Sequence, residues 1–158
     1  MPATAGSAAT PTARFKGTDV EILPYARDHL LAIKLQPAQL DAAGWITPEY
    51  AASLEGPATW TVMDQGRPVF CGGAWNLWPG RTVVWAILSE SAGSIMPRLT
   101  RSTLRYLDLL PERRVECYVD AGFRQGERWA RLLGFTHEAK LRAFLPNGND
   151  ANLYARVR

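Results

Sequence analysis

The sequence contains few of the residues that build disulfide frameworks or metal centres. It has two cysteines, Cys71 and Cys117, and two histidines, His29 and His137. Two cysteines form no disulfide framework and supply too few ligands for a structural zinc site. Both lie in apolar, strand-like segments, so we interpret them as buried core thiols rather than redox or nucleophilic groups. The histidines are far apart and have no third ligand nearby, so the sequence predicts no metal site.

Long hydrophobic runs are also missing. No stretch approaches the roughly 18 consecutive apolar residues that cross a bilayer. The N-terminus lacks the charged start and apolar stretch of a secretory signal. We therefore expect no membrane association and a cytoplasmic location. Hydrophobic side chains make up 47% of the 158 residues, which is enough to build the core of one domain.

The N-terminal residues 1–14 are small and polar and show no apolar period. Such a composition buries too little surface to offset the entropy of ordering the chain. We predict a flexible arm over residues 1–16 and a single domain over residues 17–158. An arm of this kind could bind a neighbouring subunit or a larger protein assembly.

The net charge of +3 is unevenly distributed along the chain. Residues 1–96 contain six Lys or Arg and eight Asp or Glu, whereas residues 97–158 contain twelve and seven. The C-terminal part should therefore attract anions. A phosphate-rich ligand, nucleic acid or an acidic protein surface fits this asymmetry, and the alternative is a solvated basic face.

Apolar periodicity and turn residues predict the elements of the N-terminal part. A cap at Thr47 and Pro48 at the first helical position begin a helix, and Pro37 interrupts the helix before it. The alternating segments further on predict an antiparallel meander of three strands. The expected elements are a strand over 19–24, helices over 25–35 and 48–56, and strands over 59–63, 67–77 and 81–88.

The C-terminal part begins with a loop over residues 89–94. Gly134 can take the left-handed backbone conformation that ends a helix, and Phe135 packs back as the next strand begins. Pro111 ends an earlier helix. The expected elements are a helix over 98–110, a strand over 115–119, a helix over 125–133, and two strands within 135–157 around the turn at 146–149.

This order of elements resembles the GNAT superfamily of N-acetyltransferases over about residues 18–158. The most specific likeness is the string ERWARLLGFTHEAKLRAF followed by LPNGNDANLYARV. The resemblance implies an α+β fold, with a mixed, mostly antiparallel sheet flanked by helices and a splayed gap between the fourth and fifth strands. Within the superfamily the chain is most similar to small GNAT-like proteins of tailed bacteriophages, which share the Arg-Trp before Leu-Gly-Phe and the ending from Gly148 to Tyr154.

The resemblance implies a site for acetyl-CoA, with pantetheine along the fourth strand and pyrophosphate at a helix N-terminus. Of the family's Gln/Arg-x-x-Gly-x-Gly/Ala pattern only Gly93 is present. Glu90 would repel phosphate, and Ile95 replaces a small residue. The segment is thus either a CoA cradle or a plain strand-to-helix connection. The implied cofactor-binding residues are Ile87, Leu88, Ser89, Ser91, Ala92, Gly93, Ser94 and Arg98.

The residues that the family uses for proton transfer are replaced. Ala130 stands where a tyrosine acid is frequent, and Phe123 stands where an asparagine is usual; neither exchanges a proton. Glu116 and Tyr118 alternate on the fifth strand and so share a face, which makes them candidates for a general base or a thiolate acid, as is Glu90. The alternatives are a solvated strand edge for the two glutamates and a half-buried core aromatic for Tyr118.

Arginines recur at helical spacing in two segments. They could contact the 3′-phosphate of CoA or the phosphates of nucleic acid, or they could form charged outer helix faces. They are Arg98, Arg101 and Arg105 in one helix and Arg124, Arg128 and Arg131 in the other. Trp75, Trp78 and Trp85 should cluster on adjacent strands, and because no basic residue interleaves with them we do not expect nucleic acid as a partner.

The sequence leaves two functions open. The first is transfer of an acetyl group from acetyl-CoA to an amine of a small molecule or protein, by direct attack and without a metal. The second is a catalytically decayed GNAT-like fold that acts as a phage structural (virion) or host-interaction protein. The corresponding locations are the host cytoplasm and the virion.

Overall fold

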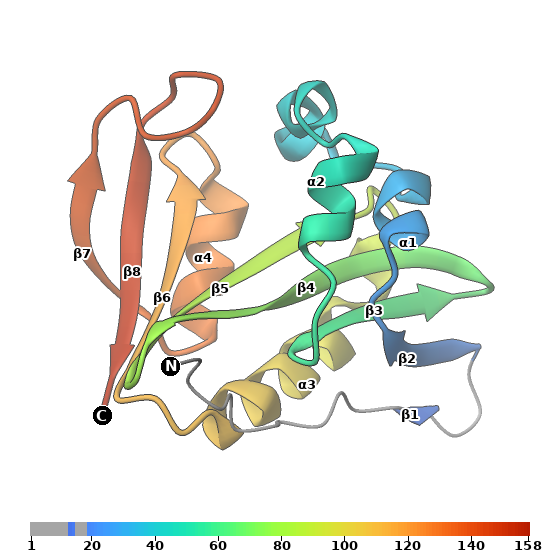
Figure 1. Ribbon diagram of the computed structural model, residues 1–158, viewed down its shortest axis with the longest axis horizontal. Coiled ribbons are helices and arrows are strands. Elements are labelled where there is room, and N and C mark those ends of the chain that lie inside the picture. Colours follow the sequence, from blue (N-terminus) through green and yellow to red (C-terminus); the bar gives the residue numbers. More distant parts are fainter. Residues whose placement is uncertain (1–12, 15–18) are drawn as a thin grey trace. The chain divides into compact units, whose positions relative to one another are not determined.

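The computed structural model describes residues 13–14 and 19–158 (Figure 1). The strands are β1 Ala13–Arg14, β2 Val20–Pro24, β3 Thr59–Asp64, β4 Arg67–Trp78, β5 Arg81–Leu88, β6 Arg114–Asp120, β7 Thr136–Leu141 and β8 Ala151–Val157. The helices are α1 Arg27–Ala32, α2 Pro48–Ser53, α3 Met96–Leu109 and α4 Arg124–Leu132, with 3₁₀ helices η1 Pro37–Gly44 and η2 Ala92–Ile95. None of these helices is both long and apolar enough to cross a membrane.

The described strands hydrogen-bond in the order β1-β2-β3-β4-β5-β6-β8-β7. The pairs β1–β2, β2–β3, β3–β4, β6–β8 and β7–β8 are antiparallel, and β5–β6 is parallel. A mixed, mostly antiparallel sheet with helices is the fold class that the sequence predicted. The meander and the closing strand pair are confirmed.

The chain divides into two compact units. The first consists of the described residues up to Ala74 together with Ala86–Ser94, and the second of Trp75–Trp85 with Ile95–Arg158. The single domain over residues 17–158 therefore stays a prediction. The predicted arm lies outside the described residues, apart from Ala13 and Arg14, which pair with Ile22 and Glu21 of β2.

Two predicted helix signals are confirmed. The Thr47 hydroxyl accepts a hydrogen bond from the Tyr50 amide at 3.1 Å, and Pro48 is the first residue of α2. Gly134 has a φ of +83°, and the Phe135 amide donates to the Ala130 carbonyl at 3.1 Å, which closes the end of α4. The sequence missed η1, because it marked Pro37 only as an interruption.

In the second unit, β6, β8 and β7 lie side by side with α4 beside them (Figure 1). Apolar side chains from α3, α4, β6 and β8 form its core. Burial at about 25 cal/mol per Å² of apolar surface holds the two helices against the sheet. The buried members of this core are Leu107, Leu110, Val115, Ala130, Leu133, Phe135 and Tyr154.

Candidate functional site

The parallel strands β5 and β6 separate soon after they meet. Their recorded pairing is confined to Arg81 with Arg114, Thr82 with Val115 and Val83 with Glu116. Beyond this point β6 continues to pair with β8 up to Asp120. This separation confirms the splayed fourth and fifth strands that the sequence predicted.

In the first unit, the end of β5 is bonded instead by residues 34–39, here called the edge segment. Leu35 forms an isolated antiparallel bridge with Ser89. The Gln36 amide donates to the Leu88 carbonyl at 3.1 Å, and the Glu90 amide donates to the Lys34 carbonyl at 2.9 Å. The edge segment therefore acts as a short additional strand.

The side chain of Gln39 extends this pairing along β5. Its Nε2 donates to the Ala86 carbonyl at 3.0 Å, and its Oε1 accepts from the Leu88 amide at 2.9 Å. A second glutamine, Gln36, donates from Nε2 to Gln39 Oε1 at 2.7 Å and holds it in place. One carboxamide thus bonds two groups that, in a neighbouring strand, two different peptide groups would bond. No pattern in the sequence indicated this contact, which joins residues 47 and 49 positions apart.

The candidate phosphate cradle follows β5. Here the amides of Ser91 and Ala92 donate to the Oγ and the carbonyl of Ser89, at 3.2 and 3.1 Å. With the Glu90 amide bonded to the edge segment, three successive N–H groups already have partners within the chain. Space remains over Gly93, where an added Cβ would meet nothing within 4 Å. The Glu90 carboxylate lies 2.6 Å from Lys34 Nζ, which opposes its charge.

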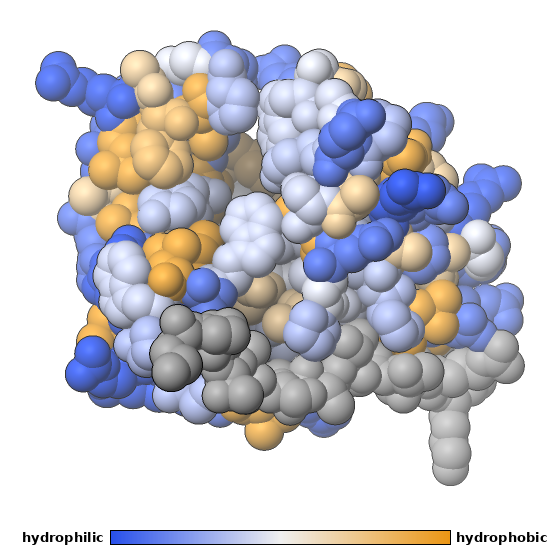
Figure 2. Space-filling model, in the orientation of Figure 1, coloured by the Kyte–Doolittle hydropathy of each residue, from blue (hydrophilic) through white to orange (hydrophobic). Residues whose placement is uncertain are grey.

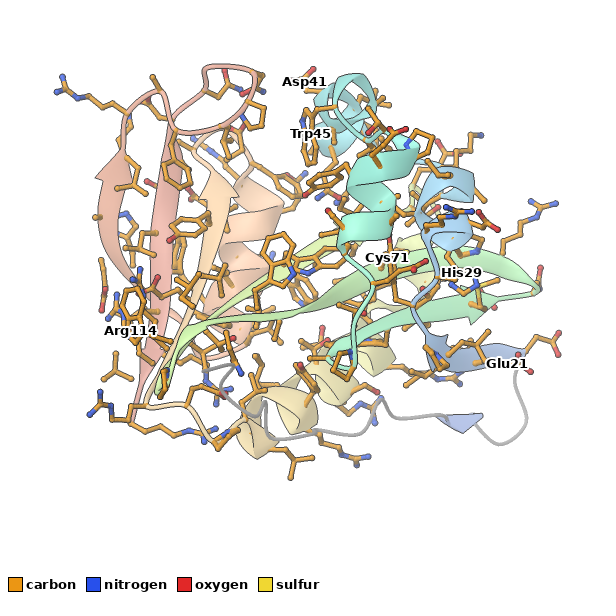
Figure 3. All side chains as sticks on the ribbon, in the orientation of Figure 1. Glu21, His29, Asp41, Trp45, Cys71 and Arg114 are labelled. Atoms are coloured by element: carbon orange, nitrogen blue, oxygen red, sulfur yellow. The ribbon has the colours of Figure 1, made fainter. Side chains whose placement is uncertain are left out.

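Glu116 lies in the second unit within a network of ion pairs. Only 1% of its side chain is exposed, so the solvated strand edge considered from the sequence is wrong for this residue. Arg81 binds it with two hydrogen bonds, from Nε to Oε1 at 3.0 Å and from the guanidinium to Oε2 at 2.8 Å. Arg114, labelled in Figure 3, binds Oε1 of Glu116 and also pairs with Glu138. Burial alone would raise the pKa of Glu116, but the two arginines together lower it.

Tyr118 lies beside Glu116 on the same face of β6, as the alternation predicted. Its hydroxyl donates to Glu116 Oε2 at 3.4 Å, and its ring lies 4.8 Å from that of Phe144. Burial and then the charge of Glu116 raise the pKa of the phenol. Tyr118 therefore keeps its proton at neutral pH. The Arg-x-Glu-x-Tyr spacing of residues 114–118 is the sequence signal that could have identified Arg114 as a partner.

Ala130 and Phe123, the two positions where the family pattern has a tyrosine and an asparagine, have packing roles. Ala130 is 4% exposed and belongs to the core of the second unit. Phe123 precedes α4 and lies so close to Gly126 that a Cβ there would stand 2.5 Å from the Phe123 ring. The six arginines on the helices are all exposed. They are Arg98, Arg101 and Arg105 on α3 and Arg124, Arg128 and Arg131 on α4.

Cys71 and Cys117 are free thiols, and burial raises the pKa of each to about 12. A thiol with so high a pKa carries almost no thiolate at neutral pH. In the first unit His29 Nδ1 lies 2.9 Å from Thr61 Oγ1, which lies 3.7 Å from Cys71 Sγ (Figure 3). Within the described part of the chain, no group of three or more His, Cys, Asp and Glu side chains could hold a metal ion.

The predicted tryptophan cluster is present in part. The rings of Trp75 and Trp85 lie 6.3 Å apart, whereas Trp78 has the Arg81 guanidinium 4.4 Å above its ring. The sequence-based statement that no basic residue interleaves with these tryptophans is therefore wrong for Arg81. Trp75 and Trp78 are 41% and 54% exposed. Other apolar side chains reach the surface at the connection between β7 and β8, as Figure 2 shows at the upper left.

No protein-family model matches the chain, and no curated protein matches its sequence. Solved structures do match it. A GNAT-family acetyltransferase from Bacillus anthracis has a TM-score of 0.63 and 12% identity, over 90% of this chain and 96% of that one. Ard1 from Thermoplasma volcanium has a TM-score of 0.73 and 13% identity, over 88% and 97%. RimL, a ribosomal alpha-N-protein acetyltransferase solved in complex with coenzyme A, has a TM-score of 0.66 and 19% identity, over 94% and 97%. The chain therefore has the fold of the GNAT acetyltransferases.

Proposed function

We propose that the chain is an N-acetyltransferase that moves an acetyl group from acetyl-CoA to an amine of a small molecule or a protein. The observation that carries the proposal is the separation of β5 from β6 after Val83 and Glu116, on a fold shared with solved acetyltransferases. Backbone N–H and C=O groups at the end of such a strand need other partners, and residues 34–39 bond four of them here. RimL, one of the similar structures, is a protein acetyltransferase in complex with coenzyme A.

The residues proposed to hold the cofactor are those that the family pattern implied. The backbone of Ile87, Leu88 and Ser89 would bind the amides of the pantetheine arm, because the Leu88 amide and the Ala86 carbonyl already bind a carboxamide from Gln39. The turn from Ser91 to Ser94 would receive phosphate, with open space over Gly93. Arg98, exposed at the beginning of α3, would supply positive charge.

Acetyl-CoA supplies a thioester that is already activated. The chain therefore has to bind acetyl-CoA and the amine, orient them and protonate the departing thiolate. We assign the proton donor to Tyr118, whose raised pKa keeps the phenol protonated. To protonate the departing thiolate, its single O–H would turn from Glu116 Oε2 toward the sulfur, and the proton that the attacking amine loses would pass to water. Glu116 accepts the hydrogen bond of the Tyr118 hydroxyl and is itself fixed by Arg81 and Arg114. Its role is to position Tyr118, since both of its oxygens are engaged.

Replacing Tyr118 with phenylalanine should lower kcat about tenfold with little change in acetyl-CoA affinity, because one general acid contributes at least this much. The measurement is steady-state turnover with an amine substrate, together with calorimetric binding. Tyr106→Phe is the matched control, because Tyr106 packs against the core of the second unit. An equal loss in both variants would show that the phenol of Tyr118 has no specific role.

A thermal-shift titration tests the function itself. A ligand that binds only the native state at about 100 times its Kd stabilises it by about 2.7 kcal/mol. For a chain of this size that corresponds to a rise in Tm of about 5–10 °C. Acetyl-CoA should produce this rise, and acetate at the same concentration should not. A melting temperature that stays constant up to millimolar acetyl-CoA would contradict the proposal.

The second candidate is an interaction protein that uses the same fold without catalysis, as a phage virion component or a host-directed protein. The observation in its favour is that the amides of Glu90, Ser91 and Ala92 already donate within the chain. It predicts no thermal shift with acetyl-CoA and no turnover. The acetyltransferase would act in the host cytoplasm, and the interaction protein would be found in the host cytoplasm or in the virion.

A further inference from the structure

Four hydrogen bonds join the edge segment to the end of β5 within the first unit. From Ala86 to Glu90, four backbone groups have partners in residues 34–39. They are the Ala86 carbonyl, the Leu88 amide, the Leu88 carbonyl and the Glu90 amide. Each N–H donates one hydrogen bond, so no second acceptor can bind Leu88 or Glu90 while the edge segment is in place.

We propose that the edge segment is a displaceable internal competitor for the amide-bearing arm of the acyl carrier, and that Gln39 occupies the carbonyl and amide of β5 that the arm would bond. The proposal rests on the acetyltransferase function proposed above. The Gln39 carboxamide presents an N–H and its C=O on the same side, so it bonds the Ala86 carbonyl and the Leu88 amide together. A trans secondary amide points its N–H and C=O in opposite directions, so the pantetheine arm would bond these two groups with its two different amides. Cofactor binding then requires the edge segment to leave.

Several features make the edge segment easy to displace. None of residues 34–39 is buried, and the nearest buried side chains on either side are Ile33 and Ala42. The backbone pairing is a single isolated bridge, and Pro37 has no N–H with which to extend it. Segments with few buried apolar contacts open at low free-energy cost.

Closure of the edge segment reduces the apparent affinity for the ligand. If the open state is a small fraction of the molecules, the observed Kd is the intrinsic Kd divided by that fraction. Removing the Gln39 carboxamide deletes two hydrogen bonds to β5 and raises the open fraction. Two ordinary hydrogen bonds correspond to about a tenfold change in this equilibrium.

The test compares acetyl-CoA binding by calorimetry in the unchanged protein, Gln39→Ala and Leu40→Ala. Leu40 is the matched control, because it is the next residue of η1 and its side chain is 57% exposed. Gln39→Ala should bind acetyl-CoA about tenfold more tightly, and Leu40→Ala should match the unchanged protein. Adenosine 3′,5′-bisphosphate, which lacks the pantetheine arm, should bind all three proteins equally.

A second measurement uses the unchanged protein and stays informative if Gln39→Ala does not fold. In amide hydrogen exchange by NMR, saturating acetyl-CoA should accelerate exchange at the Gln36 amide while the Leu88 amide stays protected. Most ligands slow exchange where they bind, so acceleration at Gln36 would mark release of the edge segment.

The outcomes separate the two proposals. Equal acetyl-CoA affinity in Gln39→Ala and the unchanged protein, or a Gln36 amide that stays protected at saturation, overturns the competitor while leaving the acetyltransferase in place. The competitor proposal is also overturned if Gln39→Ala binds adenosine 3′,5′-bisphosphate tenfold more tightly than the unchanged protein does. Such a gain in affinity would not depend on the pantetheine arm. Binding of acetyl-CoA by none of the three proteins overturns the acetyltransferase, and the competitor with it.

Discussion

Replacing Glu116 with glutamine should destabilise the protein by about 2–3 kcal/mol. The neutral amide would remain buried between the guanidinium groups of Arg81 and Arg114 and would lose both ion pairs. Loss of one partner in a buried pair costs more than the pair contributes, since the other charge stays without compensation. The arginines are 26% and 30% exposed, which places the expected loss below that of a fully buried pair. Thermal unfolding should show a decrease in Tm of about 5–10 °C.

Glu138→Gln is the matched control. Glu138 also pairs with Arg114, but 36% of its side chain is exposed, so its loss should cost at most about 1 kcal/mol. Both contributions should be lost in acid, because the hydrogen bond to Arg114 also lowers the pKa of Glu138 on folding. Since folding lowers the pKa of Glu116, its contribution is complete above the unfolded pKa of about 4.3 and is lost as the pH falls through the lower folded value. Equal stability of the two variants at pH 7 would show that the buried network contributes little.

Gly73→Ala should destabilise the protein by about 3 kcal/mol, because the position has no room for a side chain. A Cβ at Gly73 would lie 2.4 Å from Thr59 Cγ2 and 2.7 Å from the Ala58 carbonyl oxygen. Thr59 cannot move away easily, since its hydroxyl donates to the Gly56 carbonyl at 2.7 Å and accepts from the Gly56 amide. Urea unfolding at 25 °C measures the loss.

Gly44→Ala provides the comparison, because an added Cβ there meets nothing within 4 Å and should change stability by no more than about 0.5 kcal/mol. Adding Thr59→Ser to Gly73→Ala removes the clashing methyl group and keeps the hydroxyl. The double variant should regain only part of the stability, since the Ala58 carbonyl still blocks the Cβ. Full recovery would assign the whole effect to the Thr59 side chain.

The fold could be predicted because its signals are local. The Thr47 cap, Pro48, and the Gly134-Phe135 helix end each depend on backbone preferences that operate over a few residues. Alternation on β6 placed Glu116 and Tyr118 on one face, and the strand order supplied by the family resemblance placed the separation of β5 and β6 correctly. These inferences need no knowledge of what lies across the sheet.

The chemical setting of the site could not be predicted, because it depends on contacts between distant residues. Gln39 reaches β5 across 47 residues, and Arg81 reaches Glu116 across 35. No spacing rule connects such positions in a single sequence. From the sequence, Glu116 could be a general base or part of a solvated strand edge. In the structure it is buried and paired with two arginines. In the same way the sequence presented the turn after β5 as a cradle or a connection, without indicating that its amides already have acceptors.

The edge segment also bears on how the protein avoids associating with itself. A strand edge with free N–H and C=O groups is a template on which a strand of another molecule can add. Residues 34–39 cover the stretch from Ala86 to Glu90 that would otherwise be open in this way. Their release therefore exposes a surface for intermolecular pairing as well as for a ligand. Changes that loosen the edge segment should promote aggregation whenever no ligand is present to take its place.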